Sequence, residues 1–291
     1  MHIKTLATLG RISNLPTVWT NILAATVVAQ ATAFPQTDIA SPELNQIVVV
    51  LFALSFLYIG GMFLNDAFDS DWDKENNNMR PIVRDEISRQ AVWIIGGLLL
   101  FSGLYLILSQ NNAAASIAAL LLGSAIVLYN ALHKKFPAAA FIMGFTRFGV
   151  YVISALLLAE LNTTLLIIAS ALLLYITGVT YLARQEQTNI IARRWPLLLL
   201  SAPLLATISY SYTIPLYWLL AIIYSIWVFA QIKNKIFATT PDVRAGIGGL
   251  LAAIPLVDGL YLASVNALIP SFICIFVFFL VPRLHKTISG T

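Results

Sequence analysis

The feature that most constrains this chain is a series of apolar runs, each about as long as a bilayer is thick. A helix rises about 1.5 Å per residue, so roughly 20 apolar residues cross a hydrocarbon core about 30 Å thick. The chain is 59% hydrophobic and only 10% charged, unlike ordinary soluble domains. We therefore predict an all-α fold: a polytopic transmembrane helical bundle of nine to ten helices in a single domain, residues 1–291.

Ten apolar runs are the predicted membrane segments. In chain order they are Leu15 to about Phe34, Gln46–Ala67, Ala91–Leu108, Ala113–Leu132, Ala138–Ala159, Leu161–Ala183, Pro196–Tyr210, Ile214–Ala230, Gly246–Ala263 and Leu268–Val281. The last run is short for a bilayer unless its flanks join the helix. The first run is longer than the core of a signal peptide, so we interpret it as a helix. Cleavage near Ala29–Ala31 is the alternative.

The lysines and arginines are concentrated in every second loop between the apolar runs. Apart from Arg147, all of the 17 lie before the first run or after the second, fourth, sixth, eighth and tenth runs. The positive-inside rule assigns these loops and both termini to the cytoplasm. Ten crossings, or nine with a re-entrant piece, keep Arg283 and Lys286 on that side. Because topology explains the net charge of +4, we expect the lipid bilayer, and no nucleic acid, as a partner.

An acidic stretch follows the second run directly, where four of the thirteen acidic residues fall within positions 66–73. Asn65, Asp69 and Asp73 are four residues apart, so they share one face if the helix continues through them. Asp66 lies beside that face. Carboxylates this close repel one another unless a cation neutralises them. Such oxygen donors suit Mg²⁺, which completes its coordination with waters and substrate phosphates.

Two other interpretations of the acidic stretch deserve comparison. The simpler is a solvated loop that only ends the helix. The other is a calcium loop of the EF-hand type, which needs Gly at its sixth position and Glu at its twelfth. Counted from Asp69, these positions hold Lys74 and Arg80, so the calcium loop is excluded.

The run from Asn65 to Asp73, with Arg80–Ile82 after it, resembles the first aspartate-rich motif of the UbiA superfamily of intramembrane prenyltransferases. The resemblance implies that Asp66, Asp69 and Asp73 are catalytic and hold Mg²⁺ on a prenyl diphosphate, with Asn65 assisting in substrate binding. It also implies the reaction. An isoprenoid group moves from the prenyl diphosphate to an aromatic or other lipid-soluble acceptor.

Further substrate-binding residues follow from the resemblance and from position. Asn14–Asn21 resembles the family's first helix, while Tyr129 and Lys134 resemble its tyrosine-then-lysine stretch after the fourth helix. Arg80 and Lys134 are expected to bind the diphosphate; a topological role alone is the alternative. Arg147 lies inside an apolar run, where an arginine is costly unless it is paired or functional. The predicted substrate contacts here are Asn21, Arg80, Tyr129, Lys134 and Arg147. For Asn21, the alternative is a hydrogen bond to a neighbouring helix.

The loop after the sixth run departs from the family's pattern. Members that catalyse prenyl transfer carry a second motif there, of the type Asp-x-x-x-Asp. This chain has Thr180–Glu186 instead, with Glu186 as the carboxylate. We predict Glu186 as catalytic, with Tyr181 and Arg184 binding substrate. The loop resembles the EboC-type subgroup, whose members are associated with bacterial gene clusters, which implies the bacterial cytoplasmic membrane.

A second function is therefore open. In it, the chain is a non-catalytic UbiA-like membrane protein that binds a prenylated or aromatic metabolite, or helps to move it across the membrane. The altered second motif favours this alternative, as do Arg147 and Asp258 inside apolar runs. Asp258 has no role that we can assign in prenyl transfer, and the expected topology places it toward the outer half of the membrane. The intact first motif favours the enzyme.

Overall fold

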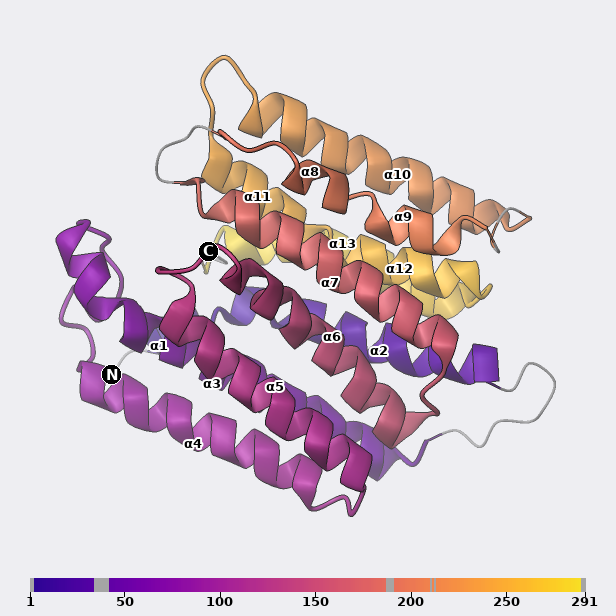
Figure 1. The fold of residues 1–291 in the computed structure, drawn as a ribbon, viewed down its shortest axis with the longest axis horizontal. Helices are drawn as coiled ribbons and strands as arrows, with labels where there is room; N and C mark the ends of the chain where they lie inside the picture. The colour runs from indigo at the N-terminus through magenta and orange to yellow at the C-terminus, as the bar shows by residue number, and fades with distance from the viewer. Residues whose placement is uncertain (1–2, 34–41, 187–190, 210, 212, 289–291) are drawn as a thin grey trace.

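The computed structural model describes residues 3–33, 42–186, 191–209, 211 and 213–288. Over these residues every regular element is a helix, so the predicted all-α fold is confirmed (Figure 1). The elements are α1 (Ile3–Leu9), the 3₁₀ turn η1 (Ile12–Asn14), α2 (Leu15–Ala33), α3 (Leu44–Glu75), α4 (Arg89–Leu108), α5 (Ala113–Leu132), α6 (Ala139–Leu158), α7 (Thr163–Ala183), α8 (Pro196–Leu199), α9 (Ala202–Thr207), α10 (Pro215–Gln231), the π-helical turn η3 (Ile232–Ile236), α11 (Val243–Ala252), α12 (Ile254–Ser264) and α13 (Leu268–His285).

Nine helical stretches in the described part of the chain have the length and composition to cross a membrane. Three of them join neighbouring elements: η1 with α2, α10 with η3, and α11 with α12. A shorter apolar stretch, Pro196–Thr207, contains α8 and α9, which lie one after the other along α10 (Figure 1). The expected bundle of nine to ten helices is confirmed, and the chain is an integral membrane protein.

Two predicted segments are interrupted where continuous helices were expected. The run at 196–210 forms α8 and α9, with Pro203 in the first turn of α9. The run at 246–263 is divided between α11 and α12, with Pro255 in the first turn of α12. A proline has no N–H to donate to the carbonyl four residues before it, and its ring clashes with that carbonyl. The two breaks therefore follow from the two prolines.

Of the predicted C-terminal ends of the tenth, first and seventh runs, the structure describes that of the tenth. The last run is longer than predicted, because α13 continues past Val281 to His285. Its flank therefore joins the helix, which makes it long enough to span. Phe34 and Tyr210, the predicted ends of the first and seventh runs, lie outside the described residues.

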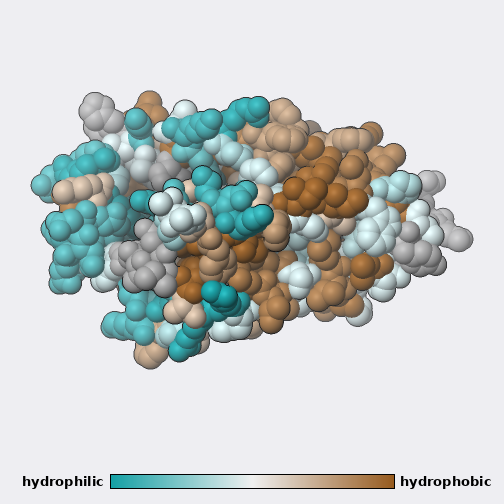
Figure 2. All heavy atoms as spheres, turned by 90° about the horizontal axis from the view of Figure 1, so that it is seen from above, coloured by the Kyte–Doolittle hydropathy of each residue, from teal (hydrophilic) through white to brown (hydrophobic). Residues whose placement is uncertain are grey.

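The helices differ in how much of their apolar surface other helices cover. In α2 and in the α11–α12 span, 78% of the most apolar window is buried, against 22% in α4 and in α13. The first two form the core of the bundle, and the apolar side chains of the other two face outward, where lipid would cover them. Hydrophilic side chains gather at one end of the molecule (Figure 2).

That hydrophilic end collects parts of the chain that are far apart in sequence. The turn η1 and the end of α13 meet there, because His285 Nε2 lies 2.7 Å from Asn14 Oδ1. Loop 76–88, which follows α3, lies at the same end (Figure 1). The end of α3 that carries the acidic stretch is thus grouped with both ends of the described chain.

Candidate functional site

The acidic stretch is the last part of a single unbroken helix. Helix α3 has 32 residues, which at about 1.5 Å per residue exceeds a hydrocarbon core of about 30 Å. Asn65, Asp66, Asp69 and Asp73 are buried on its inner side. Asp71, between them in sequence, is exposed and pairs with Arg89 at 2.9 Å. The prediction that the helix continues through the motif with these side chains on one face is confirmed.

Arg80, from loop 76–88, lies among the three buried carboxylates. Its Nη1 is 2.7 Å from Asp66 Oδ1 and 3.7 Å from Asp69 Oδ2, and its Nε is 3.5 Å from Asp73 Oδ2. Burial on its own lowers the pKa of Arg80, but Asp66, Asp73 and Asp69 together raise it above its usual value. The guanidinium therefore balances much of the negative charge of the carboxylates, a role that the sequence pattern predicts for a metal ion.

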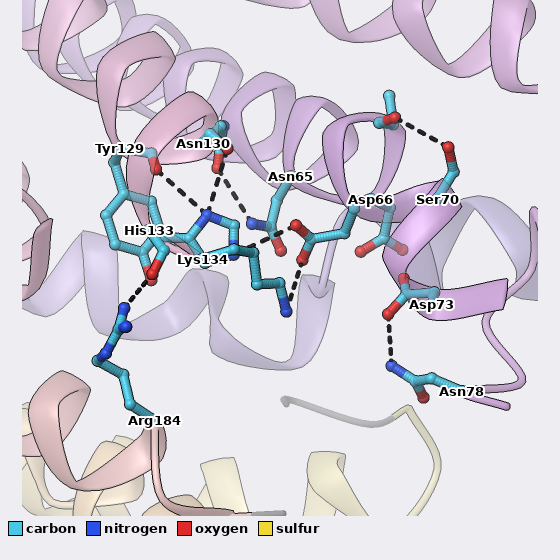
Figure 3. Close-up of polar contacts among 12 residues, drawn as sticks. Asn65, Asp66, Ser70, Asp73, Asn78, Tyr129, Asn130, His133, Lys134 and Arg184 are labelled. Carbon is cyan, nitrogen blue, oxygen red and sulfur yellow. Dashed lines mark hydrogen bonds and ion pairs between the residues drawn. The ribbon is translucent and has the colours of Figure 1, made fainter. Parts of the chain in front are cut away.

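The end of α5 supplies two further groups, both directed at Asp69. His133 Nε2 lies 3.2 Å from Asp69 Oδ1, and Lys134 Nζ lies 3.4 Å from Oδ2 (Figure 3). Lys134 Nζ also lies 3.5 Å from the centre of the Trp72 ring. Burial lowers the pKa of Lys134, against the opposing effect of Asp69. Lys134, predicted to contact the diphosphate, is here a partner of the acidic face.

Asn65 links α3 to two residues that sequence reasoning did not single out. Its Oδ1 accepts a hydrogen bond from Arg11 Nη2 at 3.0 Å, and its Nδ2 donates to Asn130 Oδ1 at 3.1 Å. Asn130 in turn donates to the Gly61 carbonyl at 3.0 Å. The available signals were an amide near the end of an apolar helix and a cation just before the first run. The position of Arg11 is explained by topology alone, so it does not by itself indicate a site residue.

The chemistry of the acidic face fits Mg²⁺, although in this conformation Arg80 neutralises much of the charge of its carboxylates. All its donors are carboxylate and amide oxygens, the type that Mg²⁺ prefers. Among the described residues, none forms a hydrogen bond with the buried Asp73 Oδ2, and Arg80 Nε lies 3.5 Å from it, so this oxygen is available to a further cation. In the described part of the chain, no group of three or more His, Cys, Asp or Glu is arranged to hold a metal ion. Asp66, Asp69 and Asp73 are thus suitable ligands that are not gathered around a metal position here.

A cavity of about 440 Å³ opens beside this face, and we call it the arginine pocket. Four arginines line it: Arg11, Arg80, Arg84 and Arg244. Asp66 is its acidic lining residue, among those that the structure describes. A pocket with this excess of guanidinium groups suits a multiply charged phosphate, because arginines bind phosphate oxygens with pairs of N–H donors.

Of the residues predicted after α7, Glu186 contacts an arginine of the pocket and Arg184 contacts the end of α5. Glu186 Oε1 pairs with Arg244 Nε at 3.3 Å, so it contacts a pocket arginine. Arg184 donates to the carbonyl of His133 and, at 3.3 Å, to that of Phe136, which ties α7 to the end of α5 (Figure 3).

Tyr181 has different neighbours. It accepts a hydrogen bond from Arg193 at 3.2 Å, and its ring packs edge-on against Trp195. Substrate binding by Tyr181 and Arg184, and catalysis by Glu186, remain predictions.

A second cavity, of about 80 Å³, lies between α2, α3, α5 and α6, and we call it the apolar slot. Most of its lining is aliphatic, with Tyr58, Tyr129, Asn130, Thr146 and Arg147 as polar members. Because Asn130 both lines the slot and bonds Asn65, the slot begins next to the acidic face. The structure thus places two predicted substrate residues, Tyr129 and Arg147, in the wall of one cavity.

A hydrogen-bonded group that we call the core network leads inward from the slot: Arg147, which is half-buried and lines the slot, and the buried Asn21, Tyr151 and Asp258. Asn21 Nδ2 donates to both carboxylate oxygens of Asp258, at 2.9 and 2.8 Å, and Tyr151 donates to Oδ1 at 2.5 Å. Arg147 donates to Asn21 Oδ1 at 2.8 Å and to Thr17 Oγ1 at 3.0 Å. Asn21 therefore sits behind Arg147 rather than in the lining of either cavity.

The sequence pointed to Arg147 and Asp258 only as isolated intramembrane charges. The structure links them through Asn21, so that α2, α6 and α12 share one network. A bridged pair of opposite charges is the form in which ionisable groups are tolerated inside a membrane. Asp258 therefore has a structural partner, which the sequence did not reveal.

Comparisons with known proteins agree on one family. The profile of the UbiA prenyltransferase family matches residues 17–242. Similar solved structures include one of digeranylgeranylglyceryl phosphate synthase in membranes, with 20% identity and a TM-score of 0.53 over 98% of this chain and 96% of that one. Another is a UbiA homologue from Archaeoglobus fulgidus bound to GPP and Mg²⁺, with 15% identity and a TM-score of 0.52 over 98% and 97% of the two chains.

The apo structure of a UbiA homologue from Aeropyrum pernix K1 is also similar, with 13% identity and a TM-score of 0.50 over 93% of this chain and 96% of that one. At such identities the likeness demonstrates a shared fold. No curated protein matches the chain. The family profile does not separate subgroups, so the EboC-type assignment stays a prediction.

Proposed function

The chain belongs to the UbiA prenyltransferase family, and from that premise we propose that it transfers an isoprenoid group from a prenyl diphosphate to an aromatic or other lipid-soluble acceptor. The observation that carries the proposal is the meeting of three features around Asn65. These are the acidic face of α3, the arginine pocket and the apolar slot. A prenyl diphosphate has the same division, with an anionic head joined to an apolar tail.

The arginine pocket would take the diphosphate head. When the allylic C–O bond breaks, the electron pair leaves with the diphosphate, and negative charge grows on its oxygens. Fixed cations placed where that charge develops stabilise the transition state. Arg84 and Arg244 line the pocket from loop 76–88 and from α11, and Glu186 holds Arg244 in place. Mg²⁺, held by Asp66, Asp69 and Asp73, would supply further positive charge toward the same oxygens.

The apolar slot would take the first part of the isoprenoid tail. Its aliphatic walls keep water away from the allylic cation, so that the acceptor and not water forms the new bond. The acceptor carbon or heteroatom then loses a proton, which balances the transfer. The Archaeoglobus fulgidus homologue bound to GPP and Mg²⁺ supports the assignment of such a ligand to this fold.

We also propose that the hydrophilic end of the molecule faces the cytoplasm. Arg80, Lys134, Arg184 and Arg244 all lie in or beside the loops at that end, and basic loops are retained on the cytoplasmic side. In a bacterial cytoplasmic membrane, this orientation would present the pocket to prenyl diphosphates made in the cytoplasm.

One observation favours the alternative of a non-catalytic carrier. Glu186 is paired with Arg244 rather than gathered with the aspartates of α3, so a second acidic site is not assembled around the pocket in the described residues. In that case the chain would bind a prenylated or aromatic metabolite without breaking a bond.

The test uses purified protein in detergent with radiolabelled geranyl diphosphate, with and without Mg²⁺, and a lipid extract as the source of acceptor. We expect Mg²⁺-dependent binding and a labelled lipid product. Asp71→Ala is the matched control, because Asp71 lies on the same helix but outside the buried face. Binding without any product, across extracts from several bacteria, would support the carrier. Absence of binding with Mg²⁺ present would overturn the transferase.

A further inference from the structure

Arg80 belongs to two sites at once. It contacts all three buried carboxylates of α3, with atom pairs at 2.7, 3.7 and 3.5 Å, and it also lines the arginine pocket. Because the same side chain contacts the carboxylates and lines the pocket, its charge lies within reach of an anion bound there.

The Arg80 guanidinium lies among the carboxylates that would be expected to bind a divalent cation. It balances Asp66, Asp69 and Asp73. Yet it leaves Asp73 Oδ2 without a hydrogen bond, although that side chain is only 1% exposed. A planar guanidinium directs its N–H donors along fixed lines and does not satisfy every oxygen of three carboxylates. The arrangement holds the charge but leaves one buried oxygen open.

We propose that Arg80 is an exchangeable counter-ion: it occupies the carboxylates until a diphosphate draws it into the arginine pocket, and only then do the carboxylates bind Mg²⁺ tightly. The inference rests on the proposed function in taking a diphosphate as the anion. Its consequence is coupling between the two ligands. Diphosphate removes Arg80, which competes with Mg²⁺ for the carboxylates, and Mg²⁺ releases Arg80 to bind diphosphate. Each ligand must therefore strengthen the binding of the other by the same factor.

Each of the other arginines of the pocket contacts at most one of the three buried carboxylates. Arg84 pairs with Glu86 at 2.9 Å and has no ion pair with the acidic face. Arg244 pairs with Glu186. Arg11 reaches Asp66 at 3.7 Å but is directed mainly at Asn65. Arg84 is thus a matched control, with the same charge, the same loop and the same pocket but no contact with the carboxylates.

The experiment measures binding of Mn²⁺, a paramagnetic substitute for Mg²⁺, to purified protein with and without inorganic diphosphate by electron paramagnetic resonance. We expect the wild type to bind Mn²⁺ about tenfold more tightly when diphosphate is present, a typical coupling between sites. Arg80→Gln should bind Mn²⁺ alone about tenfold more tightly than the wild type, gain little more from diphosphate, and bind diphosphate more weakly. Asp73→Ala defines the signal from metal bound elsewhere.

Arg84→Gln should also weaken diphosphate binding but leave the affinity for Mn²⁺ alone unchanged. The proposal is overturned if Arg80→Gln binds Mn²⁺ alone no more tightly than the wild type, or if Arg84→Gln gives the same gain. If Arg80→Gln does not fold even with Mn²⁺, Arg80→Lys decides. A lysine keeps the charge but spans fewer carboxylate oxygens, so a smaller gain in the same direction supports the exchange, and no gain overturns it.

A parallel titration with geranyl diphosphate separates this inference from the proposed function. If the wild type binds geranyl diphosphate but its affinity for Mn²⁺ does not depend on Arg80, the function stands and the exchange fails. If inorganic diphosphate shows the coupling but geranyl diphosphate does not bind, the exchange stands and the prenyl substrate is wrong.

Discussion

Two polar clusters occur in this apolar protein, and they are built differently. The acidic face of α3 is neutralised by cations on loops and helix ends: Arg80 from loop 76–88 and Lys134 after α5. The core network, in contrast, draws its members from the interior of α2, α6 and α12. Asp258 receives two hydrogen bonds on Oδ1 and one on Oδ2, whereas Asp73 Oδ2 receives none.

The difference separates a group that can exchange partners from one that cannot. Long side chains on loops reach water and move at little cost, so the ion pairs of the acidic face can be replaced by a metal ion and an anion. Asn21, Tyr151 and Asp258 are fully buried, so each partner lost from the core network leaves a buried polar group unsatisfied. We therefore expect substitutions in the core network to affect mainly stability, and substitutions in the acidic face to affect mainly ligand binding.

The largest effect is expected in the core network. Asp258→Ala should lower the free energy of unfolding by about 3–5 kcal/mol, because it leaves Asn21 and Tyr151 without an acceptor and Arg147 without its buried counter-charge. Thermal and chemical unfolding in detergent measures the loss. Asp71→Ala, which removes an exposed carboxylate, should change stability by no more than about 1 kcal/mol. Equal stability of the two variants would contradict the assignment of Asp258 as a structural anchor.

The next effect concerns binding at the acidic face. Asp73→Ala should weaken Mg²⁺-dependent binding of geranyl diphosphate at least about 100-fold, roughly 2.7 kcal/mol. It should unfold nearly as the wild type does, because it removes one hydrogen bond from the half-buried Asn78 and a longer contact, at 3.5 Å, to Arg80, which keeps its partner Asp66 at 2.7 Å. Asp69→Ala should weaken binding equally but also reduce stability, since His133 and Lys134 lose their partner. Severe unfolding of Asp73→Ala would remove the contrast between the clusters.

A smaller effect is expected in the loop after α7. Glu186→Gln keeps the shape of the side chain but weakens its hold on Arg244, so transfer should fall about tenfold, or roughly 1.4 kcal/mol in the barrier. Arg244→Gln should have a similar effect, and the double variant should be little worse than either single one. Steady-state rates of geranyl transfer measure all three. Full activity of Glu186→Gln would leave the aspartates of α3 to act without this loop.

The smallest effect is expected at Tyr181. Tyr181→Phe keeps the ring packed against Trp195 and loses only the hydrogen bond from Arg193, so transfer and stability should each change by less than about 0.5 kcal/mol. Affinity for geranyl diphosphate measured by titration provides the check. A tenfold weaker affinity would show that Tyr181 turns toward the substrate when it binds, as the sequence interpretation implies.

Much of the fold could be predicted because it depends on local properties of the chain. Apolar runs of membrane length specify helices whatever their neighbours are, since a backbone in lipid must satisfy its own hydrogen bonds. Spacing in multiples of four placed Asn65, Asp69 and Asp73 on one face of α3, and the structure confirms it. The interruption between α8 and α9 was missed, although Pro203 marks it, because apolar composition alone does not register a missing N–H donor.

The site was only partly predictable, because partners were chosen by packing and not by spacing. Asp258 lies 237 positions from Asn21, yet the two side chains are bonded, and Arg147 joins them from a third helix. Arg244 looked like one more topological cation until α11 placed it in the arginine pocket beside Glu186. The sequence determined which segments enter the membrane and where oxygen ligands gather, since both follow from periodicity and solvation. Only the tertiary structure decided which cation meets which carboxylate, since that depends on distances of a few ångströms between helices remote in the chain.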